Sequence, residues 1–272
     1  MQPVETQEVE TTLGQSDVHD TWEDAYRTDA NEQFYEMAFD RLQQDLSRHA
    51  GGLILDAGCG VGAHSARLAE RGFRALGIDV SDIVVANAQE YLEKRGVNDR
   101  VEVRKDNLLD LSFEDQKFDA ALLWGVLMHV PDIVKALSEI DRVLRMGGSL
   151  VIYEGNVNSL DATLYRALRL FRKPAGSSFR KTAAGLESWQ TTSAGRLMTR
   201  MMRISWLLGH LQQMGYRIEV RTAGQFTELY SSFSTPWIQN LFHRINEFWF
   251  RVVKKPGFAF GNIIIAEKIA RG

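Results

Sequence analysis

The sequence predicts an α/β protein with a doubly wound, mostly parallel sheet. Apolar segments of strand length alternate with segments of helical periodicity through the middle of the chain, and the first of them runs directly into a glycine-dense turn. The carboxyl ends of parallel strands meet at one edge of such a sheet, where open α/β folds bind their ligands. With 272 residues, the chain is long enough for one domain with insertions.

The elements of this core follow in chain order. We expect strands at 53–56, 73–79, 101–105, 118–124 and 149–154, and helices at 63–71, 81–95 and 132–145. Ser81 is placed to cap the second helix, and Pro131 opens the third, which Gly147 and Gly148 should end. Beyond an insertion, a helix is expected at 204–214 and strands at 216–221 and 258–268.

The turn after the first strand carries the most specific pattern. Asp56 ends the strand, and Gly58, Gly60 and Gly62 follow at alternate positions. Glycine permits positive φ and close approach of a ligand, and the next helix begins with unpaired N–H groups, so the turn predicts a nucleotide-type site. The match to a dinucleotide fingerprint is loose, and a carboxylate at Asp56 would repel a pyrophosphate.

Acidic residues also end the next two strands. Asp79 is placed to accept hydrogen bonds from both hydroxyls of a ribose, and Asp106 with Asn107 can pair with the amino edge of an adenine. With Asp56 near a positive centre, this set fits S-adenosylmethionine. The alternative is that Asp56 and Asp106 only cap their turns.

In these motifs the chain resembles the class I S-adenosylmethionine-dependent methyltransferases, in their small-molecule branch, over residues 51–154, 205–222 and 258–268. The resemblance implies a Rossmann-like, seven-stranded, mostly parallel sheet with an antiparallel last strand, carrying helical insertions. It also implies S-adenosyl-L-methionine as cofactor and S-adenosyl-L-homocysteine as product. The implied cofactor contacts are Asp56, Gly58, Cys59, Gly60, Gly62, Asp79, Val80, Asp106, Asn107, Leu108 and Trp124.

The chain divides into five expected parts. Residues 1–18 are acidic and polar and should be disordered, and 19–50 should form a helical cap. Trp22 and Tyr26 lie one turn apart in this cap, where they could close over the methionine end or dock the helix onto the core. The other parts are the cofactor-binding core at 51–156, a basic helical insertion at 157–203 on the acceptor side, and the end of the core at 204–272, with an aromatic helical insertion at 223–257.

Chemistry should come from the segment after the fourth strand. His129 is our candidate for the base that takes a proton from an attacking hydroxyl, although it could instead be a packing residue at the start of a helix. The Asn/Asp/Ser-Pro-Pro-aromatic motif of methyltransferases acting on amino groups is absent here, and the six histidines show no metal-ligand spacing. Metal-free O-methylation is therefore the leading reaction, with carbon and nitrogen acceptors open.

The insertion at 157–203 contains nine Lys or Arg residues and only Asp161 and Glu187 as acids, in a chain of net charge −3. This contrast indicates an anionic acceptor bound by Arg180 and Arg196, such as a sugar, a glycoconjugate or a secondary metabolite. The alternative is a solvated face that pairs with the acidic remainder. Glu154 and Asn156 could bind acceptor hydroxyls, or simply end the fifth strand.

Pro236 should open a helix that mixes aromatic residues with cations through 236–255. It could roof the acceptor pocket, form a dimer contact, lie at a membrane surface or pack on the sheet. We expect a small-molecule or carbohydrate acceptor, no nucleic-acid partner, a monomer or homodimer, and a cytoplasmic location, since no leader or membrane span is evident. A nicotinamide-dependent oxidoreductase and a non-catalytic cofactor-fold module are the alternative classes.

Overall fold

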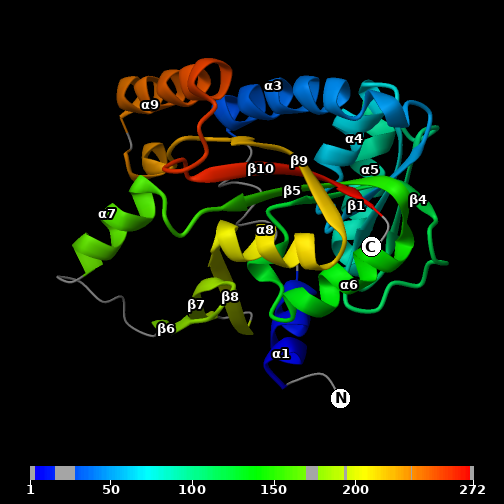
Figure 1. Ribbon diagram of the computed structural model, residues 1–272, viewed down its shortest axis with the longest axis horizontal. Helices are drawn as coiled ribbons and strands as arrows, with labels where there is room; N and C mark the ends of the chain where they lie inside the picture. Colours follow the sequence, from blue (N-terminus) through cyan, green and yellow to red (C-terminus); the bar gives the residue numbers. More distant parts are fainter. Residues whose placement is uncertain (1–3, 16–27, 170–176, 193–194, 234, 270–272) are drawn as a thin grey trace.

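The central sheet of the computed structural model has the strand order β3-β2-β1-β4-β5-β10-β9 (Figure 1). The structure describes residues 4–15, 28–169, 177–192, 195–233 and 235–269. The strands are β1 (Leu53–Ala57), β2 (Arg74–Asp79), β3 (Val101–Lys105), β4 (Phe118–Trp124), β5 (Leu144–Gly155), β9 (Tyr216–Ala223) and β10 (Gly261–Lys268). Strands β1 to β5 pair in parallel, whereas β10 is antiparallel to both of its neighbours. The predicted fold class is confirmed.

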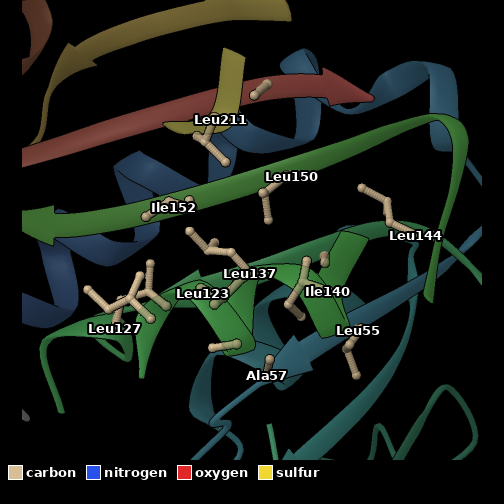
Figure 2. Packing of buried hydrophobic residues seen from close by; sticks show 14 of the residues in the cluster. Leu55, Ala57, Leu123, Leu127, Leu137, Ile140, Leu144, Leu150, Ile152 and Leu211 are labelled. Atoms are coloured by element: carbon tan, nitrogen blue, oxygen red, sulfur yellow. The ribbon is translucent and has the colours of Figure 1, made fainter. Parts of the chain in front are cut away.

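Helices cover both faces of this sheet, as a doubly wound fold requires. On one face lie α3 (Asp29–Asp45), α4 (Ala63–Glu70) and α5 (Asp82–Arg95), and on the other lie α6 (Ile133–Val143) and α8 (Ile204–Gln213) (Figure 1). Successive side chains of a strand point to opposite faces of the sheet, so each strand contributes to both layers. Leu122 packs with the first layer. Leu123 packs with the second, among the residues shown in Figure 2.

The predicted Ser81 cap is confirmed, whereas α6 is capped by Asp132, the residue after the expected Pro131. The Ser81 hydroxyl accepts a hydrogen bond from the Val84 N–H at 3.4 Å, and the Asp132 carboxylate accepts one from the Lys135 N–H at 3.0 Å. The predicted end of α6 is wrong, because β5 begins at Leu144. Gly147 and Gly148 lie within β5, where its pairing with β4 is irregular.

Residues 1–18 were expected to be disordered, and this is wrong for Val4–Leu13, which form helix α1. Its Val9 is fully buried against Trp189 and Met198, with Leu13 beside them. An apolar pair at i and i+4 is too weak a pattern to predict a helix by itself, and the partner surface lies far along the chain. Trp22 and Tyr26 lie outside the described residues.

The insertion at 157–203 was expected to be helical, and within its described residues only α7 (Leu160–Arg169) is. Strands β6 (Ser177–Lys181), β7 (Gly185–Thr192) and β8 (Gly195–Met202) form a separate antiparallel sheet. In β8, Met198, Arg200 and Met202 are buried at alternate positions. Because arginine is rarely buried, Arg200 makes the alternation of buried and exposed residues in β8 hard to recognise in the sequence.

The insertion at 223–257 contains the expected helix. Helix α9 (Pro236–Phe248) begins at Pro236 and continues into a π-helical turn, η4 (Trp249–Val253). Shorter 3-10 turns are η1 (Ser47–His49), η2 (Leu127–His129) and η3 (Leu229–Ser232). No described helix combines the length and apolar character needed to cross a membrane.

Candidate functional site

A cavity of about 340 Å³ opens at the carboxyl ends of β1, β2, β4 and β5. Its wall is completed by α1, by α3, by β8 and by the segment 225–228. Most of the residues named as cofactor contacts from the sequence line it: Gly58, Cys59, Gly60, Asp79, Val80, Asp106, Asn107, Leu108 and Trp124. Asp56 and Gly62 do not.

The glycine turn forms the floor of this cavity. Gly58 has φ of +75°, and a Cβ there would lie 2.8 Å from a Val126 methyl group, so a larger residue would strain the backbone and clash. The N–H groups of Gly58 and Cys59 both donate to the Ile78 carbonyl at 2.8 Å, which ties the turn to β2. Cys59 is buried, and burial raises the pKa of its thiol well above the usual range.

Asp79 presents a carboxylate that is already oriented. One oxygen accepts a hydrogen bond from the Gly60 N–H at 3.1 Å, and the other accepts one from the Ser81 N–H at 3.2 Å. Because both bonds come from backbone at the mouth of the turn, the carboxylate is held at the cavity edge.

Asp56 lies beneath the turn. Its carboxylate accepts a hydrogen bond from the Ser65 hydroxyl of α4 at 2.6 Å, and burial raises its pKa to about 6. Asp56 thus makes a structural contact between β1 and α4 and does not line the cavity, where a contact with a positively charged ligand was expected. Gly62 likewise starts α4 at φ +79° and faces Ala88 and Leu92 of α5.

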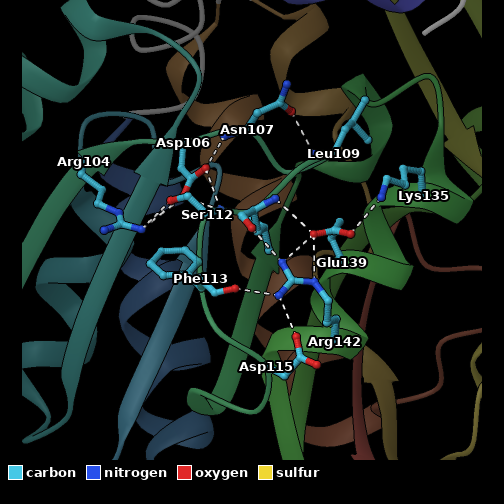
Figure 3. A network of polar contacts seen from close by, with 11 residues as sticks. Arg104, Asp106, Asn107, Leu109, Ser112, Phe113, Asp115, Lys135, Glu139 and Arg142 are labelled. Atoms are coloured by element: carbon cyan, nitrogen blue, oxygen red, sulfur yellow. Dashed lines mark hydrogen bonds and ion pairs between the residues drawn. The ribbon is translucent and has the colours of Figure 1, made fainter. Parts of the chain in front are cut away.

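The loop after β3 is fixed from two sides (Figure 3). Asp106 accepts a hydrogen bond from the Ser112 hydroxyl at 2.7 Å and forms an ion pair with Arg104 at 3.3 Å. Below it, Arg142 of α6 donates to the carbonyls of Phe113 and Leu111 at 2.6 and 2.7 Å. These bonds hold the loop that carries Asp106 and Asn107 rigidly against the core.

Helix α1 closes this end of the cavity, which the sequence did not predict. The Asn107 amide donates to the Glu10 carboxylate at 3.1 Å, and the Ser81 hydroxyl donates to the Gly14 carbonyl at 3.2 Å. Val9, Glu10 and Leu13 line the cavity. In the sequence, only the spacing of Val9 and Leu13, four residues apart, indicates this helix.

Arg180 and Arg196, the expected contacts of an anionic acceptor, do not line the cavity. Arg180 pairs with Glu187 at 2.7 Å and with Glu5 of α1 at 3.0 Å, and Arg196 pairs with Glu8 at 3.4 Å. Both guanidinium groups also stack over the Trp189 ring. These two cations thus bind the acidic N-terminal helix, in agreement with the alternative that the basic residues pair with the acidic remainder.

Aromatic rings form the opposite end of the cavity. Trp124 stacks on Tyr153 with ring centroids 4.4 Å apart and an interplanar angle of 12°, and His64 stacks on Phe39. Trp124 Nε1 is buried and has no hydrogen-bond partner among the described residues. An unpaired buried donor at a cavity wall is a position for a ligand acceptor group.

His129 lines the cavity at the end of η2. Its Nδ1 lies 3.1 Å from the Met198 carbonyl oxygen. A carbonyl oxygen can only accept, so the neutral ring carries its proton on Nδ1, and Nε2 is the basic nitrogen.

The turn that carries His129 is held by Arg200 of β8. This arginine, fully buried, donates to the carbonyls of Leu127 and Val130 at 3.0 and 2.7 Å and to that of Pro131 at 3.2 Å. Glu187 balances its charge at 2.8 Å, with both side chains inaccessible to solvent. The insertion therefore positions the segment after β4, a role that a composition analysis could not reveal.

Two carboxyl groups with raised pKa values line the aromatic end. Burial raises the pKa of Glu154 to about 8; one oxygen accepts from the Leu127 N–H at 2.8 Å, and the other has no partner among the described residues. Burial, with nearby Asp161, raises the pKa of Glu228 to about 8. Asn156 turns away and donates to the carbonyls of Gly257 and Ala259, so it ends the strand.

Glu32, Gln225 and Glu228 are further cavity residues that the sequence did not indicate. Gln225 belongs to a hydrogen-bonded group in which the Tyr153 hydroxyl donates to it at 3.2 Å and it donates to Asn31 at 2.7 Å. Of the lining residues that the structure describes, Arg67 is the one lysine or arginine, and it is paired with Glu32 and Glu36. Among the described residues, no group of three or more His, Cys, Asp or Glu side chains could hold a metal ion.

Comparison with known proteins points to one family. Residues 55–152 match the methyltransferase domain family. The chain is 32% identical over 105 residues to the sterol 24-C-methyltransferase of Saccharomyces cerevisiae, which covers 38% of this chain and 27% of that enzyme. It is 34% identical over 168 residues to the O-methyltransferase resE of Aspergillus sclerotiorum, covering 58% of this chain and 61% of that one.

A solved structure of a SAM-dependent methyltransferase from Methanosarcina mazei superposes with a TM-score of 0.58 at 23% identity, covering 84% of this chain and 98% of that one. This likeness concerns the fold. The match to the sterol methyltransferases spans only about a third of their length or less. Residues 55–152 are therefore similar to the methyltransferase domain family, and the fold is that of a SAM-dependent methyltransferase of known structure.

Proposed function

We propose that this protein transfers a methyl group from S-adenosylmethionine to a small, largely apolar acceptor. The observation that carries the proposal is the Asp79 carboxylate, oriented by the Gly60 and Ser81 N–H groups beside a glycine turn. A carboxylate at the end of the second strand suits the two hydroxyls of a ribose. When bound, S-adenosylmethionine supplies an electrophilic methyl group on its sulfonium.

The residues present fit this cofactor. The turn from Gly58 to Gly60 offers backbone and open space, since a Cβ added at Gly60 would meet nothing within 4 Å. Val80 and Leu108 offer apolar contacts to a base, and the paired side chains of Asn107 and Glu10 offer polar ones. We call this part the cofactor half and the aromatic end the acceptor half.

The acceptor half favours an uncharged molecule over an anion. Its walls include Met128, Tyr153, Met201 and Phe260, and its acids, Glu154 and Glu228, are neutral near pH 7 because of their raised pKa values. A protonated carboxyl can donate a hydrogen bond to an acceptor oxygen. We therefore replace the anionic acceptor expected from the sequence with an apolar one bearing a few oxygen or nitrogen atoms.

Transfer to oxygen is the leading reaction. His129 offers a basic Nε2 at the cavity, which can take the proton of a hydroxyl as the oxygen attacks the methyl carbon. The closed wall of α1 and the aromatic layer would exclude water and hold the reactants in line. Methylation of carbon is the second candidate, favoured by the ring-lined cavity, because rings can stabilise positive charge that develops on an apolar acceptor.

Calorimetric titration with S-adenosylhomocysteine, against NAD as a control, tests cofactor binding. We expect saturable binding of S-adenosylhomocysteine and none of NAD. Radiolabelled methyl transfer to a panel of apolar alcohols, phenols and alkenes then identifies the acceptor class, and NMR of the product identifies the atom methylated. Binding of NAD alone would overturn the proposal.

Replacing His129 with Gln tests its role as base. We expect turnover at saturating cofactor and acceptor to fall by about 10²-fold or more, with unchanged affinity for S-adenosylhomocysteine. The matched control is Met128→Leu, which changes a neighbouring cavity residue without removing a base. Full activity of the Gln variant would exclude His129 as the base and favour carbon methylation.

A further inference from the structure

Helix α9 and turn η4 expose a strip of large apolar side chains to solvent. Trp237, Leu241, Phe248 and Val252 are 68%, 50%, 57% and 63% exposed. Their spacing by four or seven residues puts them on one side of the helix, whereas Asn246 and Phe250 are buried. In Figure 1, α9 lies on the outside of the molecule, beyond the end of the sheet.

Single exposed apolar residues are ordinary, but an aligned row is typical of an interaction site. Phe258, at 71% exposure, is the most exposed large apolar side chain in the described chain and follows the same segment. Burying such a row is favourable, at about 25 cal/mol for each Å² of apolar surface removed from water.

Cations flank the row. Arg244, Arg251, Lys254 and Lys255 are all exposed, and Glu247 is the acid between residues 236 and 255. Glu247 pairs with Arg251 at 3.1 Å, whereas Arg244, Lys254 and Lys255 form no ion pair with other described residues. This contrasts with Arg180 and Arg196 of the other insertion, whose charges are paired.

We propose that this face, which we call the α9 face, binds the surface of an anionic lipid bilayer. Tryptophan and phenylalanine side chains insert at the level of the headgroups, and a lysine- and arginine-rich rim attracts anionic lipids. A second copy of the chain is a poorer partner, because a twofold contact through the α9 face would bring its cations against the same cations.

The α9 face adjoins the cavity. Phe258 is two residues from Phe260, which lines the acceptor half, and η3 directly follows Glu228, another lining residue. Leu160, 51% exposed at the start of α7, donates its N–H to the Phe258 carbonyl and extends the apolar surface. If the proposed function holds, an apolar acceptor would enter the cavity from the bilayer; the bilayer contact itself does not depend on it.

Sedimentation of the full chain with vesicles tests this inference. One set contains phosphatidylcholine alone, and the other contains phosphatidylcholine with phosphatidylglycerol. We expect binding to the anionic vesicles that weakens with salt, and little binding to the neutral ones. Absence of binding to the anionic vesicles would overturn the proposal.

Two variants separate the apolar and ionic contributions. W237S/F248S and R244Q/K254Q/K255Q should each weaken binding, the second by about 100-fold, since a cation near an anionic leaflet contributes about 1 kcal/mol. The matched control is I83S/V134S, which removes two side chains of 48% and 52% exposure on α5 and α6 and should bind as the unaltered chain does. Equal loss in the control would overturn the proposal.

Analytical ultracentrifugation distinguishes the competing partner. A dimer that W237S/F248S dissociates, without vesicle binding by the unaltered chain, would assign the α9 face to subunit contact and overturn our inference. Binding of S-adenosylhomocysteine by each variant shows that it is folded. A chain that binds vesicles but not S-adenosylhomocysteine would contradict the proposed function and leave this inference standing.

Discussion

The two halves of the cavity are built in different ways. The cofactor half is built mainly from residues that directly follow β1, β2 and β3, so neighbours in the chain are neighbours in space. The acceptor half collects side chains from η2, β5, β8 and the segment 225–228, which lie far apart in the chain. A ligand shared by a family is thus recognised by local patterns, whereas the acceptor is recognised by surfaces that only the fold assembles.

The largest effect should come from the support of the acceptor half. Arg200→Met removes the buried partner of the Glu187 carboxylate, which keeps only the exposed Arg180, and frees the turn that carries His129. We expect a loss of about 3–5 kcal/mol in the free energy of unfolding, measured by urea denaturation. Arg203→Met, at the exposed residue just beyond β8, is the control and should change it by less than about 0.5 kcal/mol. A small effect at Arg200 would mean that the acceptor half does not depend on this insertion.

In the cofactor half, Asp79→Asn should weaken binding of S-adenosylhomocysteine by about 10- to 100-fold. Each Asp79 oxygen accepts a backbone N–H, and an amide group can replace only one of these acceptors. Calorimetry measures the change, and Asp82→Asn, at an exposed residue that begins α5, should leave the affinity unaltered. Unchanged affinity in the Asp79 variant would remove the assignment of this half to the cofactor.

The raised pKa of Glu154 predicts how stability depends on pH. A carboxyl whose pKa is higher in the folded than in the unfolded state binds its proton more tightly when folded, so its contribution is present at low pH and is lost as pH rises toward about 8. The glutamine of Glu154→Gln does not ionise, so the free energy of unfolding of this variant should fall less as pH rises. The difference in slope should be up to about 1.4 kcal/mol for each pH unit. Urea denaturation between pH 5 and 8.5 measures it.

A Glu154 variant whose stability falls with pH as steeply as that of the unaltered chain would show that this carboxyl is ionised in the folded protein. Glu228→Gln is the matched comparison, because burial also raises the pKa of this second cavity carboxyl to about 8. We expect the same direction of change, so the two variants together test whether the acceptor half is electrically neutral near pH 7.

The smallest effect concerns the contact between α1 and the insertion. E5Q/E8Q removes the acids that pair with Arg180 and Arg196 and should weaken S-adenosylhomocysteine binding only several-fold, because exposed ion pairs contribute about 0.2–1 kcal/mol each. The difference should disappear at high salt. Glu70→Gln, which breaks an ion pair with Arg95, is the control. Unchanged binding in E5Q/E8Q at low salt would mean that these ion pairs do not hold α1, which then depends on the packing of Val9 and on the hydrogen bonds with Asn107 and Ser81.

Local patterns predicted much of the fold. The strand at 118–124 and the capped helix ending at Arg95 lie where expected, because their apolar periods and caps are local properties. The strands β6 to β8 and helix α1 were missed, because each is stabilised by the other: Val9 is buried only against Trp189 and Met198. Asp56 was predicted to contact the ligand because it lies beside the turn in the sequence. The sequence does not reveal that the Ser65 hydroxyl donates a hydrogen bond to its carboxylate.

By itself, the sequence determined the layered α/β core, the glycine turn and the acids Asp79 and Asp106, since each depends on residues adjacent in the chain. Only the tertiary structure decided which cations are paired and which carboxyls become neutral, because ion pairing and desolvation depend on neighbours in space. Arg180 and Arg244 are arginines of two insertions, yet Arg180 is bound to Glu5 of α1, whereas Arg244 forms no ion pair with another described residue and is exposed to solvent.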